Sequence, residues 1–132
     1  MQKDGADVLY KIGEINLKHF EGIHKVLTPN VIITETQIEH IKERHPNDYE
    51  RYFEYIPAIL EDPDYIIEAN KPNTSILLKS FSENGKNFQL ILRLKASTDP
   101  ESYENSIITF MKVNEKRYER HLRTKKILYK SE

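Results

Sequence analysis

At 132 residues the chain has the length of one ordinary domain, which can bury a core without metal or disulfide staples. It has no cysteine, so a disulfide framework, a thiol nucleophile and a thiolate metal site are excluded. Its 20 basic and 21 acidic residues leave a net charge of -1, so any nucleic-acid site must be local. No apolar run of about 18 residues and no secretory signal occurs, and we expect a cytoplasmic protein without a membrane partner.

The N-terminal part of the chain shows weaker sequence patterns for helices and strands than the rest. We interpret residues 1–30 as an N-terminal extension with a short strand within residues 7–17, and residues 31–132 as the domain proper.

A capping box predicts the first helix. Thr34 follows a brief apolar run and Gln37 stands three residues later, a spacing that satisfies the free amides of a helix start. The residue before a proline avoids the helical region, so Pro46 ends this helix, which covers roughly 34–45.

A second helical stretch follows, with Asp48 as a candidate N-cap. Helical spacing relates its apolar residues, which are Tyr49, Tyr52, Phe53, Ile56, Ile59 and Leu60. Pro57 lies inside this pattern and should kink the helix or restart it near Ile56.

The hydrophobic period then changes to that of strands. We expect strands at residues 65–67, 75–81 and 87–95, with a turn at residues 70–73 between the first two. A further strand at 106–113 precedes a polar helix at 115–123 and a last strand at 126–129 (all expected ranges). Helices followed by antiparallel strands indicate an α+β fold.

The register of the central hairpin decides which side chains share a face. A two-residue turn at Asn84-Gly85 would place Lys79 in the apolar layer with Phe88. A three-residue loop flips the faces and gathers Lys79 with Gln89, Arg93 and Lys95 on the polar side. We prefer this second register because it buries no unpaired charge.

The first helix presents a polar face. Each residue advances by about 100°, so His40 and Arg44 lie within about 40° of each other, whereas His45 is roughly 140° from His40. The histidines therefore lack the spacing of a helical metal pair, and we expect no metal and no cofactor. A surface histidine at position 40 and a helix-capping His45 are the alternatives.

The sheet supplies further candidates. Lys79, Gln89 and Arg93 would offer cations on rigid strands, and Thr109 is a hydroxyl within an apolar run. An imidazole, cations and a hydroxyl meet the requirements of metal-free RNA cleavage, which needs a base, an acid and charge on the phosphate. An exposed polar face is the alternative reading.

The segments that contain these residues also resemble a known protein family. The runs VIITETQIEHIKERHPNDYERYFEYIPAILEDPDYII, NKPNTSILLKSF, ENGKNFQLILRL, NSIITFMKV and KKILY resemble the phage-associated barnase–EndoU–colicin–RelE-like nucleases, from about Val31 to Tyr129. The resemblance implies N-terminal helices packed on a roughly four-stranded antiparallel sheet, whose open face holds the active site. It also implies a toxin-like or mobile-element ribonuclease that acts on RNA, with tRNA among the candidates, and an immunity or antitoxin protein as partner.

Carried over residue by residue, the resemblance implies roles for several of these positions. The helix histidine corresponds to His40, with Arg44 and His45 beside it, the strand lysine to Lys79, and the final-strand hydroxyl to Thr109. The residues expected to bind substrate are Arg93, Gln89 and Lys112.

Two other functions remain open at this stage. The near-neutral charge and a basic C-terminal segment would suit a catalytically inactive module that binds RNA or a partner. The basic residues of that segment are Lys112, Lys116, Arg117, Arg120, Arg123, Lys125, Lys126 and Lys130. Alternatively, this segment is only a solvated helix followed by a solubilising tail. The third interpretation of the function is a structural accessory domain of a larger mobile-element protein.

Overall fold

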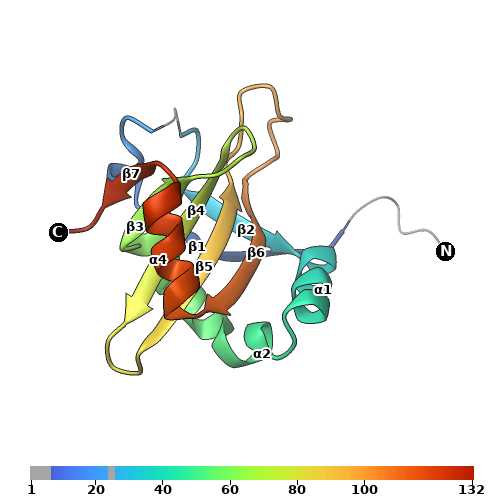
Figure 1. Ribbon diagram of the computed structural model, residues 1–132. Coiled ribbons are helices and arrows are strands. Elements are labelled where there is room, and N and C mark those ends of the chain that lie inside the picture. Colours follow the sequence, from blue (N-terminus) through green and yellow to red (C-terminus); the bar gives the residue numbers. More distant parts are fainter. Residues whose placement is uncertain (1–6, 24–25) are drawn as a thin grey trace.

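The computed structural model describes residues 7–23 and 26–132 (Figure 1). Residues 1–6 and 24–25, which belong to the expected extension, lie outside the described residues. In chain order the elements are β1 (Leu9–Glu14), the 3-10 helix η1 (Leu17–Phe20), β2 (Asn30–Thr34), α1 (Glu35–Arg44), α2 (Asp48–Tyr52), the 3-10 helix η2 (Phe53–Tyr55), α3 (Ile56–Glu61), β3 (Tyr65–Glu68), β4 (Thr74–Phe81), β5 (Lys86–Arg93), β6 (Asn105–Val113), α4 (Glu115–Thr124) and β7 (Ile127–Lys130).

The strands form one mixed sheet of seven, in the order β1-β2-β6-β5-β4-β3-β7. All described neighbours are antiparallel except β2 and β6, which run parallel. The expected architecture, N-terminal helices on a roughly four-stranded antiparallel sheet, is therefore wrong. Local patterns reveal a strand but not the distant strand that accepts its hydrogen bonds, so the roles of β1, β2 and β7 in this sheet could not be anticipated.

The β4–β5 hairpin has a different register from the one that we expected. Lys79 pairs with Phe88 across a connection at residues 82–85, so Lys79 shares a face with the apolar residues of β5. The expected gathering of Lys79 with Gln89 and Arg93 is wrong. The charge is not left unpaired, because Lys79 Nζ lies 3.6 Å from an Asp62 carboxylate oxygen and 3.5 Å from one of Asp64.

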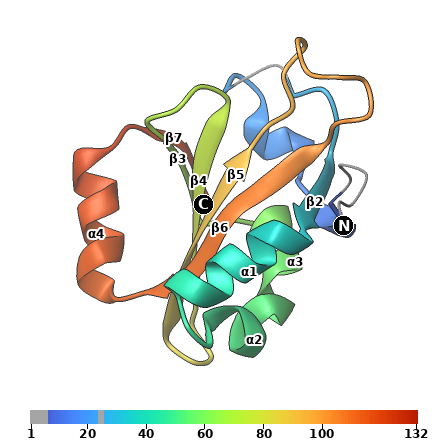
Figure 2. The ribbon, with the colours of Figure 1, turned by 90° about the vertical axis from the view of Figure 1, so that its right-hand side faces the viewer.

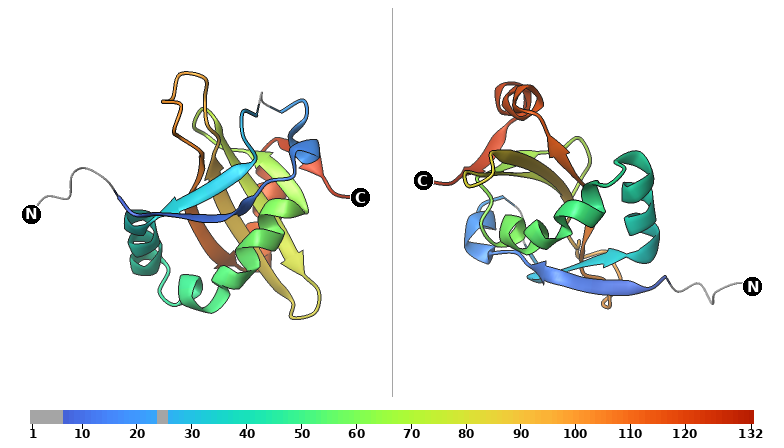
Figure 3. Two further views of the ribbon diagram at one scale, coloured as in Figure 1. Left: turned by 180° about the vertical axis from the view of Figure 1, so that it is seen from behind. Right: turned by 90° about the horizontal axis from the view of Figure 1, so that it is seen from below.

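The sheet has a helix on one side and several on the other. Figures 2 and 3 show α4 against one face and α1, α2 and α3 on the opposite side, and Figure 1 shows β1 and β2 crossing behind the central strands. We call these the α4 face and the inner face. The inner face carries the larger core, whose fully buried members include Phe20, Val31, Ile33, Ile56, Ile59, Leu60, Ile66, Leu77, Phe88, Leu90, Leu92 and Phe110. The α4 face carries a smaller cluster, which consists of Ile67, Ile76, Leu78, Met111, Val113 and Tyr118.

The helix boundaries follow the capping signals. The Thr34 hydroxyl accepts a hydrogen bond from the backbone N–H of Gln37 at 3.0 Å, as the capping box predicted. The helical stretch restarts at Ile56 with Pro57 in the first turn of α3, as predicted. At α2 the capping position is Asn47, with φ at 72°, and not Asp48. None of the helices in the described part of the chain is long and apolar enough to span a membrane.

Candidate functional site

The α4 face holds a cleft of about 720 Å³ between the sheet and α4. The β3–β4 turn forms one wall, α4 another, and the side chains of β4 and β5 form the floor. The lining consists of Ala69, Asn70, Lys71, Pro72, Asn73, Thr74, Ile76, Gln89, Ile91, Arg93, Ile108, Arg117, His121 and Lys125. No carboxylate occurs among these described lining residues, and four of them are lysine or arginine. The cleft therefore favours an anionic ligand.

His121 is the titratable group at the centre of this arrangement. Its Nε2 lies 2.7 Å from Oε1 of Gln89, a side chain on β5 that is 3% exposed. Burial lowers the pKa of His121, and the neighbouring cations Arg117, Lys125 and Arg120 lower it further. A ring with a lowered pKa is mostly neutral near pH 7, which is the state that a general base requires.

The sequence of α4 explains how His121 reaches the sheet. Asn114 caps the helix by accepting a hydrogen bond from the Arg117 N–H at 2.8 Å, and Tyr118 packs into the smaller core at 8% exposure. His121 comes one turn after Arg117 and three residues after Tyr118, so the inner side of α4 carries it over Gln89. Lys125, one turn further on, also lines the cleft.

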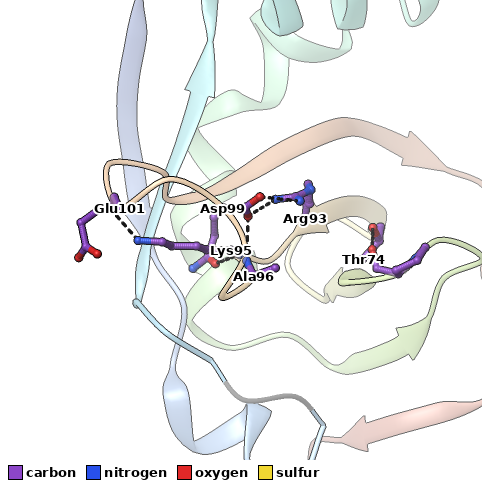
Figure 4. A network of polar contacts seen from close by, with 8 residues as sticks. Thr74, Arg93, Lys95, Ala96, Asp99 and Glu101 are labelled. Carbon is purple, nitrogen blue, oxygen red and sulfur yellow. Dashed lines mark hydrogen bonds and ion pairs between the residues drawn. The ribbon is translucent and has the colours of Figure 1, made fainter.

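Arg93 lies in the same cleft but has an acidic partner. Its guanidinium binds Asp99 through both terminal nitrogens, at 2.8 and 3.2 Å, and Asp99 also accepts the Ala96 N–H at 2.8 Å (Figure 4). The hydrogen bonds from Arg93 and Ala96 lower the pKa of Asp99, so this carboxylate stays charged. The loop after β5 thus presents a carboxylate to Arg93 in the bidentate geometry that phosphate oxygens also favour.

The expected residues of α1 do not line the cleft, although another residue of this helix contacts one of the lining residues. Gln37 donates a hydrogen bond to the carbonyl of Ile108, and Ile108 lines the cleft. His40 and Arg44 are exposed, and helical geometry puts both within about 60° of Gln37 around the axis. These two residues therefore share an exposed side of α1 with Gln37, and neither lines the cleft. His45 is half-buried and ends the helix, where its N–H bonds to a carbonyl in the last turn.

The expected strand residues do not form one group. Thr109 pairs with Ile91, which lines the cleft, so Thr109 belongs to the α4 face together with Gln89 and Arg93. Lys112 pairs with Phe88 and is therefore on the inner face, where it lines a separate hollow at the end of the hairpin.

Lys79 also belongs to the inner face. Its ammonium forms ion pairs with Asp62 and Asp64 and lies 5.8 Å from the centre of the Phe81 ring. This environment ties β4 to the segment before β3 and leaves the lysine on the opposite side of the sheet from Arg93.

The comparisons with known proteins give one match. The family model described as phage-Barnase-EndoU-ColicinE5/D-RelE like nuclease2 matches residues 9–130. The chain belongs to this nuclease family. No curated protein and no solved structure matches.

Sequence reasoning about this nuclease missed His121 as a site residue. The residues 115–123 were expected to form a polar helix, and the density of charge there suggested a solvated surface. The available signal was the spacing: Tyr118 and Leu122 mark a narrow apolar side, and His121 stands between them and Arg117. Only its position over Gln89 separates it from an ordinary surface histidine.

Within residues 7–23 and 26–132, no three histidine, cysteine, aspartate or glutamate side chains gather as they would around a metal ion.

Proposed function

We propose that this nuclease is a metal-independent endoribonuclease whose active site is the cleft between α4 and the sheet. The observation that carries the proposal is His121, held over β5 in a cleft with four lysine or arginine side chains and no carboxylate among its described lining residues. The 2′-oxygen of a ribose would attack the adjacent phosphorus, and the bond to the 5′-oxygen would break. The products are a 2′,3′-cyclic phosphate and a free 5′-hydroxyl.

His121 takes the 2′-hydroxyl proton in this proposal. Its lowered pKa keeps the ring neutral at the pH at which it must accept that proton. Arg117 on α4 and Lys125, which directly follows this helix, both line the cleft and stabilise the charge that develops on the phosphate oxygens. The apolar part of the lining, with Ile76 and Ile91, excludes water and strengthens these interactions.

The leaving 5′-oxygen needs a proton from a second group. His40 is our candidate for this acid, with Arg44 as its neighbour, because α1 borders β6 at the edge of the cleft through the Gln37 contact. Thr109 would position the phosphate from the same face. His45, at the end of α1, would hold the helix terminus in place and not contact RNA.

In this proposal Arg93 binds substrate after its ion pair with Asp99 breaks. A phosphate group would replace the carboxylate in the same bidentate geometry. Lys79 and Lys112 are outside the proposed site because the register places both on the inner face.

RNA cleavage in the presence of EDTA tests this function. Purified protein is incubated with total RNA and with tRNA, and the ends of the products are analysed for cyclic phosphate. We expect His121→Ala to lower the cleavage rate by about 10²–10⁴-fold, which is the usual contribution of a general base.

The matched control is His19→Ala. This histidine stacks on Tyr129 at 4.4 Å and lies 3.9 Å from Asp62, away from the cleft, so its removal should leave cleavage within about threefold of wild type. Absence of cleavage by the wild-type protein, or equal rates for wild type and His121→Ala, contradicts the proposal.

The second candidate is a catalytically inactive RNA-binding module of the same fold. The observation in its favour is that Arg93 is neutralised by the chain's own Asp99, while exposed cations continue along α4 beyond the cleft. In this case RNA binds uncut, with an affinity that falls steeply with salt. Arg120→Gln and Arg123→Gln would weaken that binding, and His121→Ala would not.

For the biological setting we propose what the resemblance implied. The protein would act as a toxin-like or mobile-element ribonuclease, with an immunity or antitoxin protein as its partner. Co-expression that rescues growth and blocks cleavage identifies such a partner.

A further inference from the structure

Gln89 stands in an unusual place for a polar side chain. It is 3% exposed, in the middle strand of the sheet, and its cross-strand neighbours on the two sides are Leu78 and Met111, both buried. An amide at such a position costs free energy unless it is hydrogen-bonded. The partner that the structure gives it is the imidazole of His121.

In the orientation that the structure gives the Gln89 amide, the contact assigns the proton to one ring nitrogen. The amide oxygen Oε1 faces His121 Nε2 at 2.7 Å, and a carbonyl oxygen can only accept. Nε2 must therefore be protonated and donate to Gln89. The lone pair of the neutral ring is then on Nδ1, which is free to accept a proton from substrate.

A neutral hydrogen-bond acceptor at position 89 suits a general base at His121 better than a carboxylate would. The charges that act on the pKa of His121 are cations, namely Arg117, Lys125 and Arg120; Lys71 and Arg93 line the same cleft, and Arg93 is paired with Asp99. A carboxylate at position 89 would stabilise the protonated ring, whereas the amide orients the ring without adding that charge. An amide at position 89 can thus orient the ring without opposing the burial and the cations that lower its pKa.

We propose that Gln89 is a positioning residue, which holds the His121 ring in its Nε2–H form and leaves Nδ1 as the base. The catalytic consequence of this inference rests on the proposed ribonuclease function. The orientation and tautomer of the His121 ring do not depend on that function. It changes the role that the sequence suggested for Gln89, from binding substrate to orienting the group that acts on it.

The test measures the His121 ring directly in the full chain. Nitrogen-15 labelling of the histidines and long-range proton–nitrogen spectra report the tautomer and the titration of each ring, and the signal lost in His121→Asn assigns residue 121. In wild type we expect the Nε2–H form. Gln89→Met keeps the volume but removes the acceptor, so the ring should populate both tautomers.

Gln89→Glu keeps the acceptor and adds a charge. It should retain the Nε2–H form and raise the pKa of His121 by about 1 unit or more. Gln37→Met, the same change at a glutamine that bonds to Ile108 and not to His121, is the spectroscopic control and should leave the tautomer of residue 121 unaltered. Thermal unfolding of each variant verifies that it is folded.

Cleavage supplies the second measurement. Gln89→Met should lower kcat by about tenfold or more with a smaller change in KM, as expected when a catalytic histidine loses its orienting partner. In Gln89→Glu the acid side of the pH–rate profile should move to higher pH.

The outcomes separate the two proposals. An unchanged His121 tautomer in folded Gln89→Met, or an Nδ1–H form in wild type, overturns the role of Gln89 whatever the cleavage data show. A tautomer that is fixed in wild type and mixed in Gln89→Met, together with RNA left uncut by wild type, supports the orientation of the ring and overturns the ribonuclease function.

Discussion

Asn105 joins three segments of the chain at the point where the sheet changes from antiparallel to parallel pairing. It is fully buried at the start of β6, opposite Val31 of β2. Its Oδ1 accepts the Lys95 N–H at 2.8 Å, and its Nδ2 donates to the Thr28 carbonyl at 2.8 Å. One amide thus satisfies one backbone donor and one backbone acceptor.

We predict that Asn105→Leu destabilises the protein by about 2–6 kcal/mol. The change roughly preserves volume but leaves two backbone groups without partners, and each such group costs about 1–3 kcal/mol. Against a total stability of roughly 5–15 kcal/mol this is a large loss. The loop that follows Lys95 carries Asp99, so the variant should also loosen the carboxylate that binds Arg93.

Urea unfolding measures the effect through the free energy of unfolding and its slope with denaturant. Ser97→Ala, an exposed change in the same loop, is the control and should stay within about 0.5 kcal/mol of wild type. A loss below about 0.5 kcal/mol in Asn105→Leu, with an unchanged slope, would refute the reasoning that these two hydrogen bonds hold the junction together.

Two further predictions concern charge. Burial lowers the pKa of His121 most, and the charge of Arg117 lowers it further. Arg117→Gln should therefore raise this pKa toward its usual value, which an NMR titration measures. An unchanged pKa would mean that Arg117 is too distant or too hydrated to act on the ring. Hydrogen bonds from Arg93 and the Ala96 N–H make the pKa of Asp99 lower in the folded state than in the unfolded state. The charged carboxylate therefore stabilises the fold at pH values above its unfolded-state pKa of about 3.9. This contribution is lost as the pH falls through the folded-state pKa. Asp99→Asn should therefore show a shallower acid loss of unfolding free energy than wild type, and equal slopes in the two proteins would contradict the ion pair.

Several elements were predictable because their signals are local. The capping box placed the start of α1, Pro57 placed the restart of the helix at Ile56, and alternating apolar residues placed the strands of the central hairpin. Each of these signals depends on contacts within a few residues, which are the same in the sequence as in the folded chain.

The faces of the sheet were not predictable in the same way. A change of one residue in the connection between β4 and β5 turns every side chain of one strand to the opposite face. We chose the wrong connection because a lysine in an apolar layer suggested an unpaired charge, and the carboxylates of Asp62 and Asp64 that pair with Lys79 come from another segment. Sequence spacing carries no information on such a partner.

Helix α1 begins and ends close to the positions that its capping signals predicted, and its Gln37 contacts β6 through the carbonyl of Ile108. The sequence alone determined the absence of thiol chemistry, the helices with strong caps and the existence of most strands, because composition and short-range hydrogen bonding suffice for these. Tertiary structure decided the parallel pairing of β2 with β6, the face on which each cation lies and the meeting of His121 with Gln89. These depend on long-range contacts, in which residues 32 positions apart are brought to 2.7 Å by the packing of α4 against the sheet.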